Sequence, residues 1–167
     1  IPYSLTTPIL LKLLEESYSV TRSVLIMQKE VAQRICALPG NKDYGILSVY
    51  CTVYMHVELA FIIPPACFFP IPKVDSALVR FTPRHLRNWN DPEEFFFRSI
   101  VRCAFSSRRK TIFNCLKKLL VKHGLQPDQF YHYACKQGID LSRRAETFTA
   151  DDFDMLTSSL KSFSKEC

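Results

Sequence analysis

The hydrophobic period of this chain changes once, after a polar stretch at residues 83–92, and this change restricts the fold more than any other feature. Before it, short apolar or alternating segments typical of strands are interleaved with helical patterns. After it, apolar residues recur every three or four positions, which is the period of a helix. The 167 residues therefore predict an α/β part at residues 1–83, a linker at 84–92 and a small all-helical part at 93–167.

Three segments of the first part are predicted to be strands, at residues 23–27, 57–63 and 76–82. The last of them places Ala77, Val79 and Phe81 on one face, because the side chains of a strand point alternately to its two sides. Residues 46–55 leave two choices open. Their β-branched and aromatic content favours a strand, whereas their length also permits a helix.

The remaining regular segments have helical spacing. Thr6 or Thr7 is expected to cap the first helix, and Thr149 the last, because a hydroxyl oxygen can accept from the free N–H groups of a first turn. Gly124 suits a helix C-terminus, where the backbone often turns left-handed. The predicted helices cover residues 6–16, 29–38, 93–105, 109–123, 127–137 and 151–163.

Positive charge is concentrated in the second part. The chain has a formal net charge of +6, and residues 95–127 contain no acidic residue. A one-sign block on a helical region favours nucleic-acid binding, because Lys and Arg displace the counterions of phosphates. The alternative is a solvated basic surface without RNA. The basic residues of the block are Arg98, Arg102, Arg108, Arg109, Lys110, Lys117, Lys118 and Lys122.

The cysteines indicate a reducing compartment. There are seven, an odd number, and no Cys-x-x-Cys pair occurs, which argues against a disulfide framework and against a zinc site. We therefore expect no metal and a cytoplasmic protein. The most apolar stretch, residues 46–71, is interrupted by His56, Glu58 and prolines, so no membrane span is expected either.

A proline-framed segment combines two aromatic side chains with a cation. It reads Pro64-Pro65-x-x-Phe68-Phe69-Pro70-x-Pro72-Lys73-Val74-Asp75-Ser76-Ala77. The prolines leave the backbone around Phe68 few conformations. An aromatic side chain beside Lys73 suits a nucleobase and its phosphate. The alternative is that Phe68 and Phe69 are core residues beneath a rigid loop.

Six segments, taken in their order along the chain, resemble the family of ribosomal RNA adenine dimethyltransferases of the small-subunit type. Ile1-Pro2-Tyr3 is similar to the last three positions of the family's Asn-Leu/Ile-Pro-Tyr motif. The stretch from Pro64-Pro65 through Arg80, which includes the proline-framed segment, and Arg108-Arg109-Lys110-Thr111 match two others. The remaining three are Gln28-Lys29-Glu30-Val31-Ala32-x-Arg34, Asp43-Tyr44-Gly45-x-Leu47-Ser48-Val49 and Leu141-Ser142-x-Arg144-Ala145-Glu146.

The resemblance implies a fold and an activity. The first part would be the C-terminal part of a Rossmann-like class I methyltransferase domain, and the second a helical RNA-binding domain. The enzyme would use S-adenosylmethionine to dimethylate N6 of adenines in small-subunit ribosomal RNA. We expect a monomer whose partner is the small ribosomal subunit. The glycine-rich segment that binds the donor is not in this sequence, so we expect a fragment that is inactive alone.

The resemblance also assigns site residues. Catalytic positions are Ile1, Pro2, Tyr3 and Phe68. The Ile1 carbonyl would accept a hydrogen bond from the adenine amine, and Tyr3 and Phe68 would stack on the two faces of the flipped base. Tyr3 is also the residue assigned to the methyl donor. The residues assigned to RNA are Lys73, Arg102, Arg108, Arg109, Lys110, Lys117 and Lys118.

Three other functions remain as alternatives. The chain could be a non-catalytic RNA-binding module in ribosome assembly, although a pure binder does not need Tyr3 and Phe68. It could belong to the related methylases of large-subunit RNA, or to relatives in organelle transcription. The segments Lys73-Val74-Asp75-Ser76-Ala77 and Arg108-Arg109-Lys110-Thr111 favour the small-subunit type.

Overall fold

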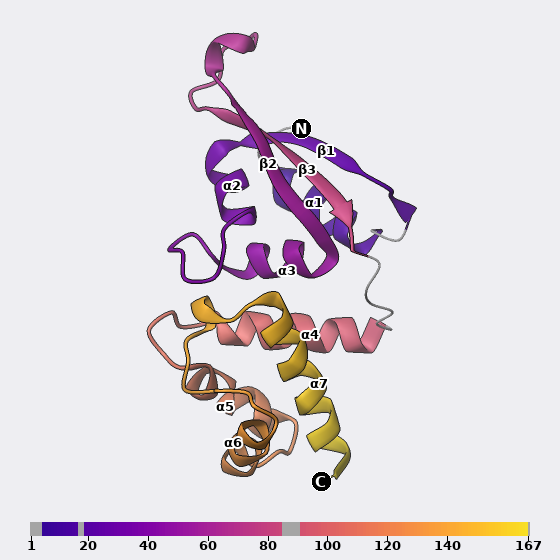
Figure 1. The fold of residues 1–167 in the computed structure, drawn as a ribbon, viewed down its shortest axis with the longest axis vertical. Coiled ribbons are helices and arrows are strands. Elements are labelled where there is room, and N and C mark those ends of the chain that lie inside the picture. The colour runs from indigo at the N-terminus through magenta and orange to yellow at the C-terminus, as the bar shows by residue number, and fades with distance from the viewer. Residues whose placement is uncertain (1–4, 17–18, 85–90, 167) are drawn as a thin grey trace. The chain divides into compact units, whose positions relative to one another are not determined.

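A computed structural model of the chain describes residues 5–16, 19–84 and 91–166. The chain divides into two compact units, Ile1–Leu38 with Asp43–Arg87 and Pro39–Lys42 with Asn88–Cys167. Figure 1 shows the elements of each unit. Most of the predicted linker, residues 85–90, lies outside the described residues.

The first unit mixes helices and strands, as predicted. A short 3₁₀ helix at Pro65–Cys67 lies in the segment that joins its last two strands. The other elements, in chain order, are α1 (Thr6–Glu15), β1 (Ser23–Gln28), α2 (Lys29–Ile35), α3 (Ile46–Tyr54), β2 (Met55–Ile63) and β3 (Ser76–Pro83).

The three strands form one sheet in the order β1-β3-β2. The central strand β3 is antiparallel to both neighbours, with Leu25 opposite Val79 and Val57 opposite Phe81. It follows that β1 and β2 run in the same direction. Strands in the same direction need a crossover connection, and here α2 and α3 make it. The described sheet is antiparallel, and it is the combination of this sheet with helices that agrees with the predicted α/β class.

The core of this unit lies on one face of β3. Ala77, Val79 and Phe81 are fully buried, whereas Arg80 between them is exposed. The alternation predicted for this strand is confirmed. Helix α2 packs against all three strands. Its buried residues are Ala32 and Ile35, so the helix covers the apolar side of the sheet.

Residues 46–54 form a helix, although their composition favours a strand. The start of α3 is fixed by contacts: the Gly45 N–H donates to Ser48 Oγ at 3.0 Å, and Ser48 Oγ donates to the Arg34 carbonyl oxygen at 2.5 Å. Both Val49 and Cys51 are fully buried. Packing therefore overrides the strand preference of β-branched residues. Burial also raises the pKa of the Cys51 thiol.

Two predicted helix ends are wrong. Helix α1 begins at Thr6, so Leu5 occupies the capping position and no side chain caps the helix. The Thr6 hydroxyl is instead buried and has no hydrogen-bond partner among the described residues. Helix α2 ends at Ile35 rather than at residue 38. The predicted cap of α1 failed because packing places Thr6 inside the helix.

The second unit is helical, as predicted. Its elements are α4 (Asp91–Ala104), α5 (Ile112–Lys122), α6 (Pro127–Lys136), a short 3₁₀ helix at Ala145–Thr147, and α7 (Ala150–Glu166). Buried aromatic rings form its core. The ring centroid of Phe153 lies 5.9 Å from that of Phe105 and 5.5 Å from that of Phe148. Among the described residues, no helix is long and apolar enough to cross a membrane.

Two helix ends of this unit follow their predicted chemistry. Gly124 follows α5 with φ +73, the left-handed conformation that favours glycine. The Asp152 N–H donates to Thr149 Oγ1 at 3.0 Å, and the Thr149 N–H donates to Asp152 Oδ2 at 2.9 Å. These reciprocal bonds form a capping box at the start of α7. The predicted cap by Thr149 is confirmed.

Candidate functional site

The proline-framed segment joins β2 to β3 and begins with a single 3₁₀ turn. The N–H groups of Cys67 and Phe68 donate to the carbonyl oxygens of Pro64 and Pro65, both at 3.1 Å. Phe68 then leaves the turn in extended conformation, with φ −123 and ψ 152, and is half-buried. Phe69 is 99% exposed. The two phenylalanines therefore have different environments, and Phe69 is not a core residue.

The end of this segment is attached to the start of α2. The Lys29 N–H donates to the Asp75 carbonyl oxygen at 3.0 Å, and Lys29 Nζ forms an ion pair with Asp75 Oδ2, also at 3.0 Å. Directly after Asp75, Ser76 pairs with Gln28 of β1 and with Ile63 of β2. The segment is thus held at both ends by the sheet and by a charged contact.

A cleft of about 420 Å³ lies beside these contacts, and Lys73 is exposed at its wall. The cleft sits where β1 and β2 end, because Gln28 closes β1 and Pro65 follows β2. Because β1 and β2 run in the same direction, their C-terminal ends lie at one edge of the sheet, and the cleft is at this edge. The lining residues are Gln28, Lys29, Glu30, Gln33, Pro65, Lys73, Val74 and Asp75; Phe68 is not among them.

Three of the four predicted catalytic residues, Ile1, Pro2 and Tyr3, lie outside the described residues. The structure therefore does not relate them to Phe68. Phe68 and Lys73 belong to the same segment, as predicted, but only Lys73 lines the cleft.

The predicted RNA-binding cations of the second unit lie on α4, on α5 and on the turn between them. The three cations of that turn, Arg108, Arg109 and Lys110, are exposed, and we call them the basic turn. One of them has a structural contact: the Arg108 guanidinium donates to the Lys42 carbonyl oxygen at 2.8 Å. The other predicted cations are also exposed: Arg102 on α4, and Lys117 and Lys118 on α5.

Two cations of the basic block have partners within their own helix. Arg98 forms an ion pair with Glu94 four residues earlier, and both side chains are largely buried. Residues 95–127 contain no acidic residue, but Glu94 lies just before them and balances the charge of Arg98. Lys117 Nζ lies 4.6 Å from the ring centroid of Phe113, close enough for a cation–π contact.

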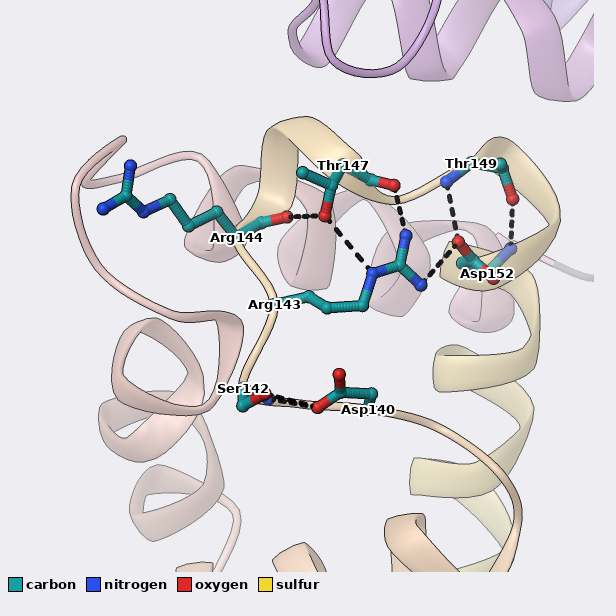
Figure 2. A network of polar contacts seen from close by, with 7 residues as sticks. All are labelled: Asp140, Ser142, Arg143, Arg144, Thr147, Thr149 and Asp152. Carbon is teal, nitrogen blue, oxygen red and sulfur yellow. Dashed lines mark hydrogen bonds and ion pairs between the residues drawn. The ribbon is translucent and has the colours of Figure 1, made fainter.

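Arg143 belongs to a polar network at the start of α7 (Figure 2). Its Nε donates to Thr147 Oγ1 at 3.3 Å, and its guanidinium also donates to the Thr147 carbonyl oxygen. A further guanidinium nitrogen lies 3.3 Å from Asp152 Oδ2, the same carboxylate oxygen that accepts from the Thr149 N–H. The guanidinium stacks 4.6 Å from the Phe148 ring centroid. Arg143 therefore ties the 3₁₀ turn to the helix start.

Arg144, the next residue, is arranged in the opposite way. Its side chain is exposed, and Figure 2 shows it directed away from the network. Its backbone forms a β-bridge with Thr111, the residue that follows the basic turn. The adjacent Ile112 N–H donates to the Arg143 carbonyl oxygen at 2.9 Å, which holds the two segments together. Arg144 thus adds a cation beside the basic turn, although charge patterning did not select it.

The two neighbouring arginines should differ in their effect on stability. We expect Arg143→Ala to lower the free energy of unfolding by about 1–2 kcal/mol, because it removes several hydrogen bonds and leaves Asp152 with one partner fewer. Arg144→Ala should change it by less than ~0.5 kcal/mol, as for other exposed side chains. Urea unfolding of the two variants measures both values. Equal losses would contradict the division between a structural and an available arginine.

Comparison with known proteins establishes the family. The model of the ribosomal RNA adenine dimethylase family matches residues 1–161. The chain belongs to this family. The predicted resemblance is therefore confirmed, and it includes the small-subunit type, because the curated relatives carry that name.

Two relatives illustrate how far the match extends. Both are named ribosomal RNA small subunit methyltransferase A. The protein of Geobacter metallireducens is 41% identical over 157 residues, which cover 94% of this chain and 56% of the relative. The protein of Listeria monocytogenes is 42% identical over 168 residues, which cover 99% of this chain and 56% of the relative. The chain thus spans little more than half the length of these family members.

Solved structures show the same fold. A dimethyladenosine transferase from Plasmodium falciparum aligns with a TM-score of 0.80 over 99% of this chain and 65% of its own, at 22% identity. The 23S rRNA methyltransferase ErmE aligns with a TM-score of 0.64 over 96% of this chain and 63% of its own, also at 22% identity. At this identity the likeness concerns the fold of the family alone.

Proposed function

We propose that this chain is the C-terminal part of an enzyme that dimethylates N6 of adenines in small-subunit ribosomal RNA. The family match over residues 1–161 carries the proposal. The names of the small-subunit relatives support the choice of RNA. Because the chain covers little more than half of those relatives, the activity is proposed for the complete protein.

The chain's own residues would position the adenine. The amine is a poor nucleophile, since its lone pair is delocalised into the ring. An acceptor such as the Ile1 carbonyl, held against an N–H, directs that lone pair outward. Tyr3 and Phe68 would stack on the base, and stacking of ~1–3 kcal/mol per base offsets a flipping cost of a few kcal/mol. Positioning of this kind needs no general base of unusual pKa.

S-adenosylmethionine would supply the methyl group. Tyr3 is the residue of this chain assigned to the donor, and it lies outside the described residues. The described residues are therefore proposed to contact the adenine and the RNA backbone, and none of them is proposed to bind the donor.

The exposed cations would hold the RNA backbone. Lys73 lines the cleft at the strand ends and has no ion-pair partner among the described residues, so it is available to a phosphate near the flipped base. In the helical unit Arg109, Lys110 and Arg144 are exposed and close in the fold. Guanidinium groups suit phosphates because they donate two parallel hydrogen bonds. Arg102, Lys117 and Lys118 extend the predicted contact along α4 and α5.

A non-catalytic assembly factor is the second candidate, because exposed cations alone would serve it. One experiment separates the two. The complete protein is incubated with S-adenosylmethionine and unmodified small subunits, with large subunits as the control substrate, and nucleosides are identified by mass spectrometry. N6,N6-dimethyladenine in small-subunit RNA alone supports the enzyme. Binding without methylated product favours the assembly factor, and product in large-subunit RNA favours the other methylase group.

A further inference from the structure

The loop that joins β2 to β3 carries an apolar side chain that nothing in the described chain covers. Phe69 is 99% exposed, more than any other large apolar residue described. Ile71 nearby is 70% exposed. Figure 1 shows the loop projecting past the end of the sheet. Exposed apolar side chains grouped in this way mark interaction sites more often than isolated ones.

The loop holds Phe69 in a restricted position. Pro64, Pro65, Pro70 and Pro72 fix the φ angle at four positions around it. The Lys29–Asp75 contacts anchor the far end of the loop to α2. A side chain on such a loop loses little conformational freedom on binding, so it is suited to rigid insertion.

Phe68 and Phe69 are directed differently. Successive side chains of an extended backbone point to opposite sides, and Phe68 is extended. Phe68 is half-buried while Phe69 is open to solvent. Side chains that leave neighbouring Cα atoms on opposite sides reach two separate places. Phe68 can therefore face a base outside the stack while Phe69 faces the stack itself.

We propose that Phe69 is a wedge that enters the RNA stack beside the target adenine and fills the gap that the flipped base leaves. The proposal rests on the proposed function, in which Phe68 covers the flipped base. Apolar wedges such as phenylalanine are known to separate neighbouring bases, and any base offers a face for stacking. Lys73, exposed on the same loop, supplies the positive charge that an RNA strand requires and a purely apolar partner does not.

The test uses the complete protein and an RNA hairpin with 2-aminopurine at the adenine that mass spectrometry identifies as methylated. The fluorescence of 2-aminopurine rises when the base leaves the stack. In Phe69→Ala we expect this rise to be mostly lost and the single-turnover methylation rate, measured on the adenine substrate, to fall by about 5- to 100-fold. Phe69→Trp should retain both signals. The matched control is Phe95→Ala, which removes a phenylalanine that is 74% exposed on α4 and should leave flipping unchanged.

Other outcomes overturn the wedge. A melting temperature several degrees lower in Phe69→Ala would mean that Phe69 packs against the remainder of the protein. A weaker affinity with normal fluorescence would make it an ordinary contact. Wild-type flipping and methylation in Phe69→Ala would reject the wedge and leave the proposed function intact. Absence of methylation by the wild-type protein would reject the proposed function, and the wedge with it.

Discussion

Phe68→Ala in the complete protein should slow methyl transfer by about 5- to 150-fold and weaken RNA binding much less. The range corresponds to the loss of one base–aromatic stacking contact of ~1–3 kcal/mol. The effect should appear in the rate, because the contact forms only when the adenine leaves the helix. RNA affinity should change little, since cations distributed over both units provide most of it.

Single-turnover kinetics and a separate binding titration measure the two quantities. Phe68→Tyr preserves an aromatic face and should recover most of the rate, whereas Phe68→Leu preserves only bulk and should not. An equal loss of rate and affinity would sink the stacking role. Phe68 is half-buried, so the melting temperature of each variant must accompany the rates.

Neutralising Arg109, Lys110 and Arg144 together should weaken RNA binding roughly 100-fold near physiological salt. The logarithm of the binding constant falls linearly with the logarithm of the salt concentration, and each lost phosphate contact makes this slope shallower by ~0.7–0.9. Three lost contacts should therefore make the slope shallower by about 2–3. Arg108 is left in place because it also donates to the Lys42 carbonyl oxygen, and its removal would mix binding with structure.

Glutamine substitutions and titrations at several salt concentrations provide the measurement. Lys136→Gln is a control for a single exposed charge, on α6 and away from the bridge between Thr111 and Arg144. It should leave the slope unchanged, while Arg144→Gln alone should lower it by nearly one. A triple variant with the wild-type slope would show that these cations form a solvated surface without RNA contact.

Features set by local pattern were predictable from the sequence. The alternation in residues 76–82 identified β3 and its buried face, and Thr149 identified the start of α7. Features set by long-range contacts were not. Residues 46–54 carry a strand-like composition but become helical, because Ser48 reaches the Arg34 carbonyl oxygen and the apolar side chains are buried.

The site shows the same division. Composition singled out Lys73 and the three cations of the basic turn, all of which are exposed, but it placed Arg109 and Lys110 inside a helix that begins only at Ile112. It could not distinguish Arg143 from Arg144, which are neighbours of identical chemistry. Arg143 forms an ion pair with Asp152 on α7, whereas the backbone of Arg144 bridges to Thr111, which is distant in the sequence. Likewise, only the fold separates a half-buried Phe68 from an exposed Phe69.

The central position of β3 has a consequence during protein synthesis. It is the last strand of its unit in the chain, yet both other strands pair with it and not with each other. As the chain leaves the ribosome, β1 and β2 therefore lack the neighbour that they share in this sheet until residues 76–83 emerge. Open strand edges favour aggregation and chaperone binding, so nascent chains stalled before Ser76 should be the most dependent on assistance.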